Sequence, residues 1–275
     1  MVLGCDGTET PINSYLAGTA NAGSLNSNLD VDDTVLAFNT EASRDDETKI
    51  QSIRVLFIGN SHSAPIPALM KDLVKRLRPD QKAHFGVVRS SGFLAEQAES
   101  ATTRTTIRTG KWDYVVLQAQ KYSSSGKRSY PTDGAMKLSE LATKAGAKLL
   151  MYPEWPRRDA GGDEYGRIKT IHLSIAEKTG AVVAPIGEAW VKAAASNPSL
   201  SLYARDGNHA TQDGSYLNAC VFYSLLFGES PVSETSKSPK GLFKSHKALE
   251  EAAWSAVEEC KSEKDGPGEL IKGQK

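Results

Sequence analysis

The stretch that decides the fold is "IRVLFIGNSHSAPIPALMKDLVKRL", residues 53–77. It opens with a continuous apolar run that contains β-branched residues, which is typical of a strand covered on both faces. The run stops at a small polar turn. Apolar residues then recur at helical spacing over 66–77, and the prolines stand where a first helical turn tolerates them. A buried strand, a turn and an amphipathic helix therefore follow one another, with Asn60, Ser61 and His62 at the carboxyl end of the strand.

The same alternation of strand and helix continues along the chain. Further strands are expected at 83–88, 112–118, 147–152 and 181–186. Further helices are expected at 94–108, 134–146, 163–180, 187–196, 214–228 and 245–261. This order predicts an α/β fold, a three-layer α/β/α sandwich around a flavodoxin-like, mostly parallel five-stranded sheet. Such sheets bind ligands outside the carboxyl ends of their strands, where Ser61 is expected.

Composition and charge narrow the class of protein. The 275 residues are 39% hydrophobic and 24% charged, which is ordinary for a globular protein. Thirty-three basic residues balance thirty-three acidic ones, which argues against a nucleic-acid partner. No apolar run approaches the roughly 20 residues that a transmembrane segment needs. Residues 1–50 are polar and aperiodic, so a flexible N-terminal tether is expected there, followed by one domain at 51–262 and a disordered tail at 263–275.

The three cysteines, Cys5, Cys220 and Cys260, have no CxxC spacing, which argues against a zinc or redox site. A Cys220–Cys260 disulfide and two free thiols both remain open. Leu3-Gly4-Cys5 has the look of a bacterial lipoprotein processing site, although the basic region and apolar segment that should precede it are missing. One expectation is therefore a lipid anchor at Cys5 on a secreted, periplasmic or surface-anchored bacterial protein, and the other is coincidence.

A second polar motif, "DGNH" at 206–209, stands just before the most apolar predicted helix. A Ser-His-Asp hydrolase needs a histidine that reaches the serine hydroxyl and a carboxylate that orients the imidazole. Asp206 and His209 are close enough in sequence for one turn to orient both. The sequence therefore predicts Ser61 as nucleophile, His209 as general base and Asp206 as its acid.

The sequence lacks the motifs of three other kinds of site: the α/β-hydrolase elbow, the phosphate-binding loop and a metal site. The Gly-x-Ser-x-Gly elbow of α/β-hydrolases is not met, because Ser63 stands at its fifth position. The chain has no Gly-rich phosphate loop, and no His or Cys cluster accompanies Asp206 and His209. Neither a nucleotide or flavin cofactor nor a metal is therefore expected.

At these residues the chain resembles the SGNH, or GDSL-like, hydrolases over about residues 53–228. The family's four blocks correspond here to "FIGNS" (57–61), "RSSGFLAEQ" (89–97), "DYVVLQAQ" (113–120) and "DGNH" (206–209). The third block looks like a bacterial branch that reads Leu-Gln-x-Gln. The resemblance implies an oxyanion hole made by the backbone N–H groups of Ser61 and Gly92 and by a side-chain amide. Since the family's asparagine is absent from the third block, that amide would be Gln120, or alternatively Gln118.

The resemblance also implies an activity. It points to a serine esterase that forms an acyl-enzyme on a small-molecule or carbohydrate ester, such as acetylated carbohydrate. Asn60, His62, Glu154 and Trp155 are expected at the substrate rim. For His62 the alternative is a solvent-facing turn residue, and for Trp155 it is a packed ring. The alternative function is a non-catalytic carbohydrate-binding protein on the same scaffold, with a degraded oxyanion site.

Overall fold

The computed structural model describes residues 52–89, 92–160, 163–232 and 246–264. All of them belong to one unit, Thr48–Lys275. The predicted tether, with Cys5, lies outside the described residues, and so does the predicted tail from residue 265 onward. The localisation expected from Cys5 therefore stays a prediction.

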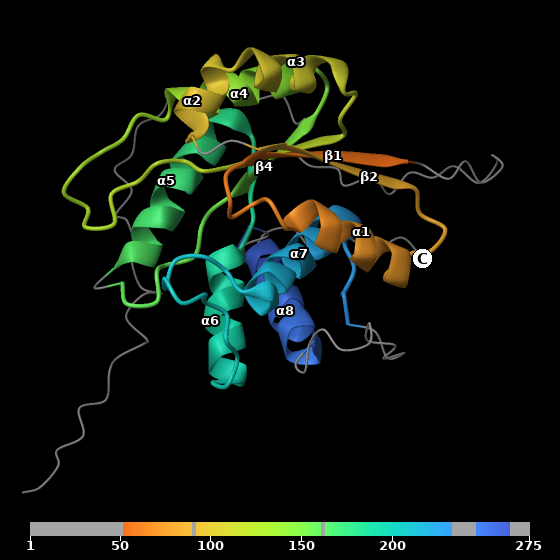
Figure 1. Ribbon diagram of the computed structural model, residues 1–275, viewed down its shortest axis with the longest axis vertical. Helices are drawn as coiled ribbons and strands as arrows, with labels where there is room; N and C mark the ends of the chain where they lie inside the picture. The colour runs from red at the N-terminus through yellow and green to blue at the C-terminus, as the bar shows by residue number, and fades with distance from the viewer. Residues whose placement is uncertain (1–51, 90–91, 161–162, 233–245, 265–275) are drawn as a thin grey trace, which may run out of the picture. The chain divides into compact units, whose positions relative to one another are not determined.

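A parallel sheet forms the centre of the fold, with the strand order β2-β1-β3-β4-β5 (Figure 1). The strands are β1 (Ile53–Gly59), β2 (Ala83–Arg89), β3 (Tyr114–Gln118), β4 (Lys148–Tyr152) and β5 (Val182–Val183). This is the flavodoxin-like order, so the predicted fold class is confirmed. The order reverses between β1 and β3, and the residues that follow these two strands therefore meet at the edge where such sheets bind ligands.

Helices cover both faces of the sheet, and Figure 1 shows α2, α3 and α4 on the opposite side of the strands from α1, α6, α7 and α8. The first layer consists of α2 (Leu94–Glu99), α3 (Ala101–Thr109), α4 (Asp133–Lys144) and α5 (Glu164–Thr179). The second layer consists of α1 (Ile66–Leu77), α6 (Ile186–Ser196), α7 (Gln212–Phe227) and α8 (His246–Lys264). In β1, Leu56 and Ile58 pack toward the first layer, while Val55 and Phe57 pack toward the second. This alternation is why the β1 sequence is apolar throughout.

Two elements differ from the prediction. The helix expected at 94–108 is two helices, because Ser100 is extended (ψ 120°) and its side chain accepts the Thr103 N–H, which caps α3. The strand expected at 181–186 pairs only through Val182 and Val183. Pro185, which has no N–H to donate to a strand, then leads directly into α6.

Two remaining questions from the sequence concern cysteines and membranes. Cys220 is buried in α7 and Cys260 lies on α8, and no disulfide joins them, so the disulfide alternative is wrong. Within the described ranges, no helix is both long enough and apolar enough to cross a bilayer.

Candidate active site

The turn between β1 and α1 presents Ser61 to solvent. The Asn60 side-chain oxygen accepts the His62 N–H at 3.1 Å, and the Asn60 carbonyl accepts both the N–H and the hydroxyl of Ser63, at 3.2 and 3.1 Å. Asparagine stabilises such turns by bonding to the backbone two residues on. Asn60 was expected at the substrate rim, and the structure places its side-chain oxygen inside the turn instead.

Ser61, His209 and Asp206 form one chain of hydrogen bonds. The Ser61 Oγ lies 2.9 Å from the His209 Nε2, although 148 positions separate the two residues. The His209 Nδ1 lies 2.5 Å from one Asp206 oxygen, and the other oxygen accepts the backbone N–H groups of Asn208 and His209, both at 3.0 Å. The hydrogen bond from the His209 side chain is the largest cause that holds the pKa of Asp206 well below its ordinary value, and the bonds from these two N–H groups add to it. The convergence that the sequence predicts is present, and the carboxylate is charged.

The loop that carries Asp206 and His209 is a narrow hairpin-like segment. Tyr203 and Ala210 pair as an antiparallel bridge, and the Ala204 N–H bonds the His209 carbonyl at 2.8 Å. Gly207 turns the loop with a φ of 68°, a conformation that glycine adopts without a steric penalty. The Gly207 carbonyl accepts the Arg158 N–H at 2.8 Å, which ties this loop to the segment after β4.

His62 and Trp155, both expected at the substrate rim, are buried, with exposed fractions of 8% and 2%. The His62 ring stacks on His209, with ring centroids 4.7 Å apart. Trp155 stacks on Trp190 at 4.3 Å, and its indole N–H bonds the Asn208 carbonyl at 3.0 Å. The rim prediction is therefore wrong for both residues. The packed alternative holds for Trp155, but the solvent-facing alternative for His62 is also wrong.

Both glutamines of the third block are buried and engaged. The Gln120 amide nitrogen donates to the Lys121 and Pro131 carbonyls at 2.9 and 3.1 Å, which uses both of its hydrogens. Gln118 instead donates to a Glu154 oxygen at 2.9 Å and accepts the Asn60 N–H at 2.8 Å. The structure thus contradicts Gln120 as the side-chain donor to an oxyanion, because it has no amide hydrogen to spare. Gln118 links the nucleophile turn to the segment after β4. Because this link uses only one hydrogen of its amide, its role as the alternative oxyanion donor stays a prediction.

Glu154, the remaining residue expected at the rim, has its carboxyl bonded to Gln118 and so turned toward the end of the sheet. Burial raises the pKa of Glu154 to about 7, and nearby Glu164 adds to the shift, while the bond from Gln118 and the charges of His209 and Arg157 oppose it. This carboxyl group therefore keeps its proton to a higher pH than an ordinary glutamate.

A backbone donor remains for an oxyanion at Ser61. The Ser61 N–H makes no hydrogen bond within the described parts of the chain. Gly92 directly precedes the turn into α2, beyond the end of β2, and residues 90–91 before it are outside the described ranges. Its oxyanion role stays a prediction.

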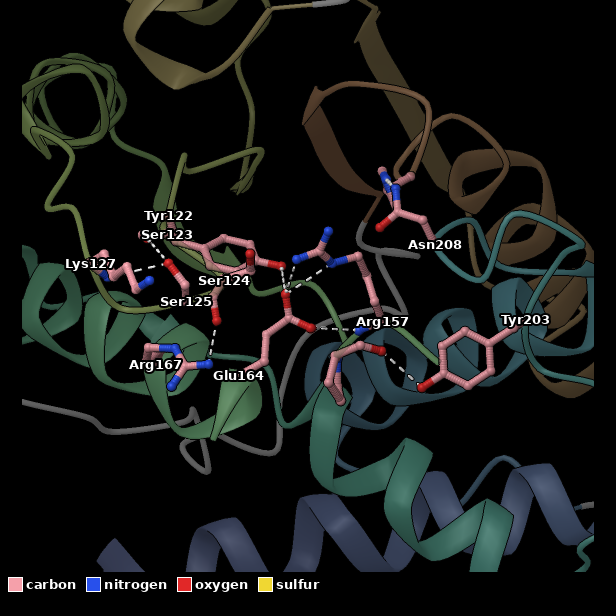
Figure 2. Close-up of polar contacts among 12 residues, drawn as sticks. Tyr122, Ser123, Ser124, Ser125, Lys127, Arg157, Glu164, Arg167, Tyr203 and Asn208 are labelled. Carbon is pink, nitrogen blue, oxygen red and sulfur yellow. Dashed lines mark hydrogen bonds and ion pairs between the residues drawn. The ribbon is translucent and has the colours of Figure 1, made fainter. Parts of the chain in front are cut away.

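The sequence does not reveal an ion pair beside the triad, in which the buried Glu164 carboxylate meets the exposed side chain of Arg157. Figure 2 shows Glu164 between Tyr122 and Arg157. Glu164 is 1% exposed and accepts three N–H groups of Arg157, at 2.9 to 3.1 Å, and the Tyr122 hydroxyl at 3.1 Å. A depression of about 400 Å³ borders this cluster and reaches Asp206; it is lined by Ser124, Ser125, Arg157, Asp159, Ala160, Glu164, Asp206 and Gly207. In the sequence, Glu164 looked only like a first-turn helix residue.

Comparisons with known proteins agree with this fold. No protein-family model matches the chain, and no curated protein gives a significant match. The structure is similar to that of a DUF4886 family protein from Bacteroides uniformis, with 21% identity, a TM-score of 0.59, and coverage of 75% of this chain and 95% of that one. It is also similar to a candidate SGNH hydrolase from Slackia heliotrinireducens, with 25% identity, a TM-score of 0.51, and coverage of 64% and 100%.

These similarities show that the chain has the fold of the SGNH hydrolase superfamily. They do not bear on the Leu-Gln-x-Gln branch, which stays a prediction.

Proposed function

We propose that this protein is a serine esterase that cleaves carboxylic esters through an acyl-enzyme. The observation that carries the proposal is the unbroken contact from Ser61 through His209 to Asp206. His209 would take the Ser61 proton as the oxygen attacks the ester carbonyl, and would then give it to the departing alcohol. Water would repeat the sequence on the acyl-enzyme. The Asp206 carboxylate would stabilise the imidazolium of His209 in both steps.

The oxyanion in this mechanism would rest on backbone N–H groups, for which Ser61 and Gly92 are the proposed donors. Removing one donor from such a site costs about 3–4 kcal/mol of transition-state stabilisation. The Gln120 amide, whose two hydrogens are both engaged, is therefore the observation that favours the second candidate, a non-catalytic carbohydrate-binding protein.

The substrate class is also a proposal. Burial of Trp155 removes the aromatic platform that would favour a sugar ring. The depression beside Asp206 supports a hydroxylated alcohol group, because the hydroxyls of Ser124 and Ser125 and the carboxylate of Asp159 line it. Acetylated carbohydrate is therefore kept as the proposed substrate alongside simple esters.

Ester turnover by purified protein tests the function. We expect the wild type to hydrolyse p-nitrophenyl acetate or acetylated xylan, and Ser61→Ala to lose activity by about 10⁴-fold or more, since the nucleophile has no substitute. Ser255→Ala on α8 is the matched control and should keep wild-type turnover. Equal turnover by Ser61→Ala would refute the esterase. Xylan binding without hydrolysis by the wild type would favour the second candidate.

A further inference from the structure

We infer that His62 is a positioning residue for His209: its ring is the surface against which the imidazole of the triad is held. The two rings are nearly parallel, with an interplanar angle of 13° and centroids 4.7 Å apart. This inference rests on the proposed function, because it concerns how the general base of that reaction is oriented.

The stack continues from His209 into the core. Trp155 lies against His62 with ring centroids 5.1 Å apart and an interplanar angle of 55°, and Trp190 of α6 lies flat on Trp155 at 4.3 Å and 4°. The exposed fractions are 8% for His62 and 2% for each tryptophan, whereas the His209 side chain is 44% exposed. The outermost ring, that of His209, is therefore supported by three buried rings. These cannot easily move, since close-packed interiors resist displacement.

The nitrogens of His62 contribute little to this arrangement. Its Nε2 lies 3.4 Å from the Asn208 amide nitrogen, which is longer than an ordinary hydrogen bond. Its Nδ1 is buried and has no hydrogen-bond partner among the described residues. The main chain places the residue instead, because its N–H bonds Asn60 and its carbonyl accepts the Tyr152 hydroxyl at 3.2 Å. His62 thus acts through the face of its ring.

The charge state of His62 suits this role. The titratable groups that influence it are His209, whose ring lies against it, and Asp206 from the same loop. Burial, followed by the charge of His209, lowers the pKa of His62 to about 4 against the opposing charge of Asp206, so the ring is neutral near neutral pH. A neutral aromatic face stabilises a cation lying on it. When His209 becomes an imidazolium during the reaction, His62 therefore presents a π face rather than a second positive charge.

The test compares two variants at this position by the rate at which a fluorophosphonate labels Ser61. His62→Leu removes the ring and should slow labelling about 2- to 10-fold, the factor that corresponds to one aromatic pair. His62→Phe keeps a ring and should retain the wild-type rate.

A matched control is available on β2. His84 is exposed and stacks on Trp112 at 5.5 Å, so His84→Leu also removes a histidine–tryptophan stack and should label at the wild-type rate. Thermal unfolding of each variant separates positioning from folding, because a merely structural role would lower the melting temperature without slowing the labelling of the folded protein.

Labelling of His62→Leu at the wild-type rate, or equal slowing of His62→Phe and His62→Leu, would overturn the inference. Failure of the wild type to label at all is a different result, since it would overturn the proposed esterase and with it the reaction that this inference serves.

Discussion

Gln118 joins the nucleophile turn to a carboxyl group at the end of β4. Its side-chain oxygen accepts the Asn60 N–H, and its amide donates to Glu154. Gly59 leaves room for this link, because a Cβ there would lie 2.2 Å from the Gln118 side-chain oxygen. A buried amide bonded at both ends fixes the backbone that carries Ser61, since either group left unpaired would cost free energy.

The titration of Glu154 should appear in the free energy of unfolding. The folded protein holds this proton up to about pH 7, whereas the unfolded chain loses it near 4.5. The stabilisation is therefore complete below pH 4.5 and is lost as pH rises through 7. Glu154→Gln keeps an oxygen for Gln118 but does not titrate. When the pH rises from about 5 to about 8, the free energy of unfolding of this variant should therefore fall by roughly 1–3 kcal/mol less than that of the wild type. Urea unfolding at both pH values measures this, and parallel pH dependence of the two proteins would contradict it.

The candidate triad could be predicted from the sequence because short stretches of sequence identify each of its residues. Asp206 and His209 share one turn, and Ser61 follows a strand that can be recognised from its composition. The hydrogen-bond partners of the Gln120 and Trp155 side chains could not be predicted. They depend on Pro131 and Asn208, which lie in other loops and whose positions only the tertiary structure sets.

At the scale of elements, the Tyr203–Ala210 loop sets the geometry of the acid and base. Gly207 has a φ of 68°, and a Cβ there would lie 3.4 Å from the Arg158 Cβ. Gly207→Ala should cost about 1 kcal/mol or more of stability through strain, because side chains disfavour this region. It should also reduce ester turnover several-fold, since the loop also orients His209.

Gly180, which ends α5 with the same φ of 68°, provides the matched control because nothing lies within 4 Å of its Cβ position. Gly180→Ala should show a similar loss in thermal unfolding and unchanged turnover. Equal turnover by the two variants would show that the loop does not control the site.

The boundaries of elements were harder to predict than their existence. One polar helix is expected over 94–108, yet Ser100 breaks it by capping α3. The apolar run at 181–186 has a strand's composition, but β4 pairs with only two of its residues before α6 begins. In both places hydrogen bonding, rather than hydrophobic pattern, decides the outcome.

At the scale of the molecule, strand order brings the site together. β1 and β3 are adjacent, β4 lies next to β3, and each strand delivers a polar residue or turn to the same edge. The sequence was sufficient to predict this architecture because alternating strands and helices leave few permitted winding orders. It could not predict the ring stack under His209, because those rings come from three separate segments.

The central claim is that the contact with His209 and Asp206 makes Ser61 nucleophilic. Peptide mass spectrometry after treatment with a fluorophosphonate tests it most directly, because only an activated serine reacts. The account predicts one adduct, on Ser61, which is lost in His209→Ala and retained in His84→Leu. An unlabelled Ser61 in folded wild-type protein, or equal labelling of the His209→Ala variant, would contradict it.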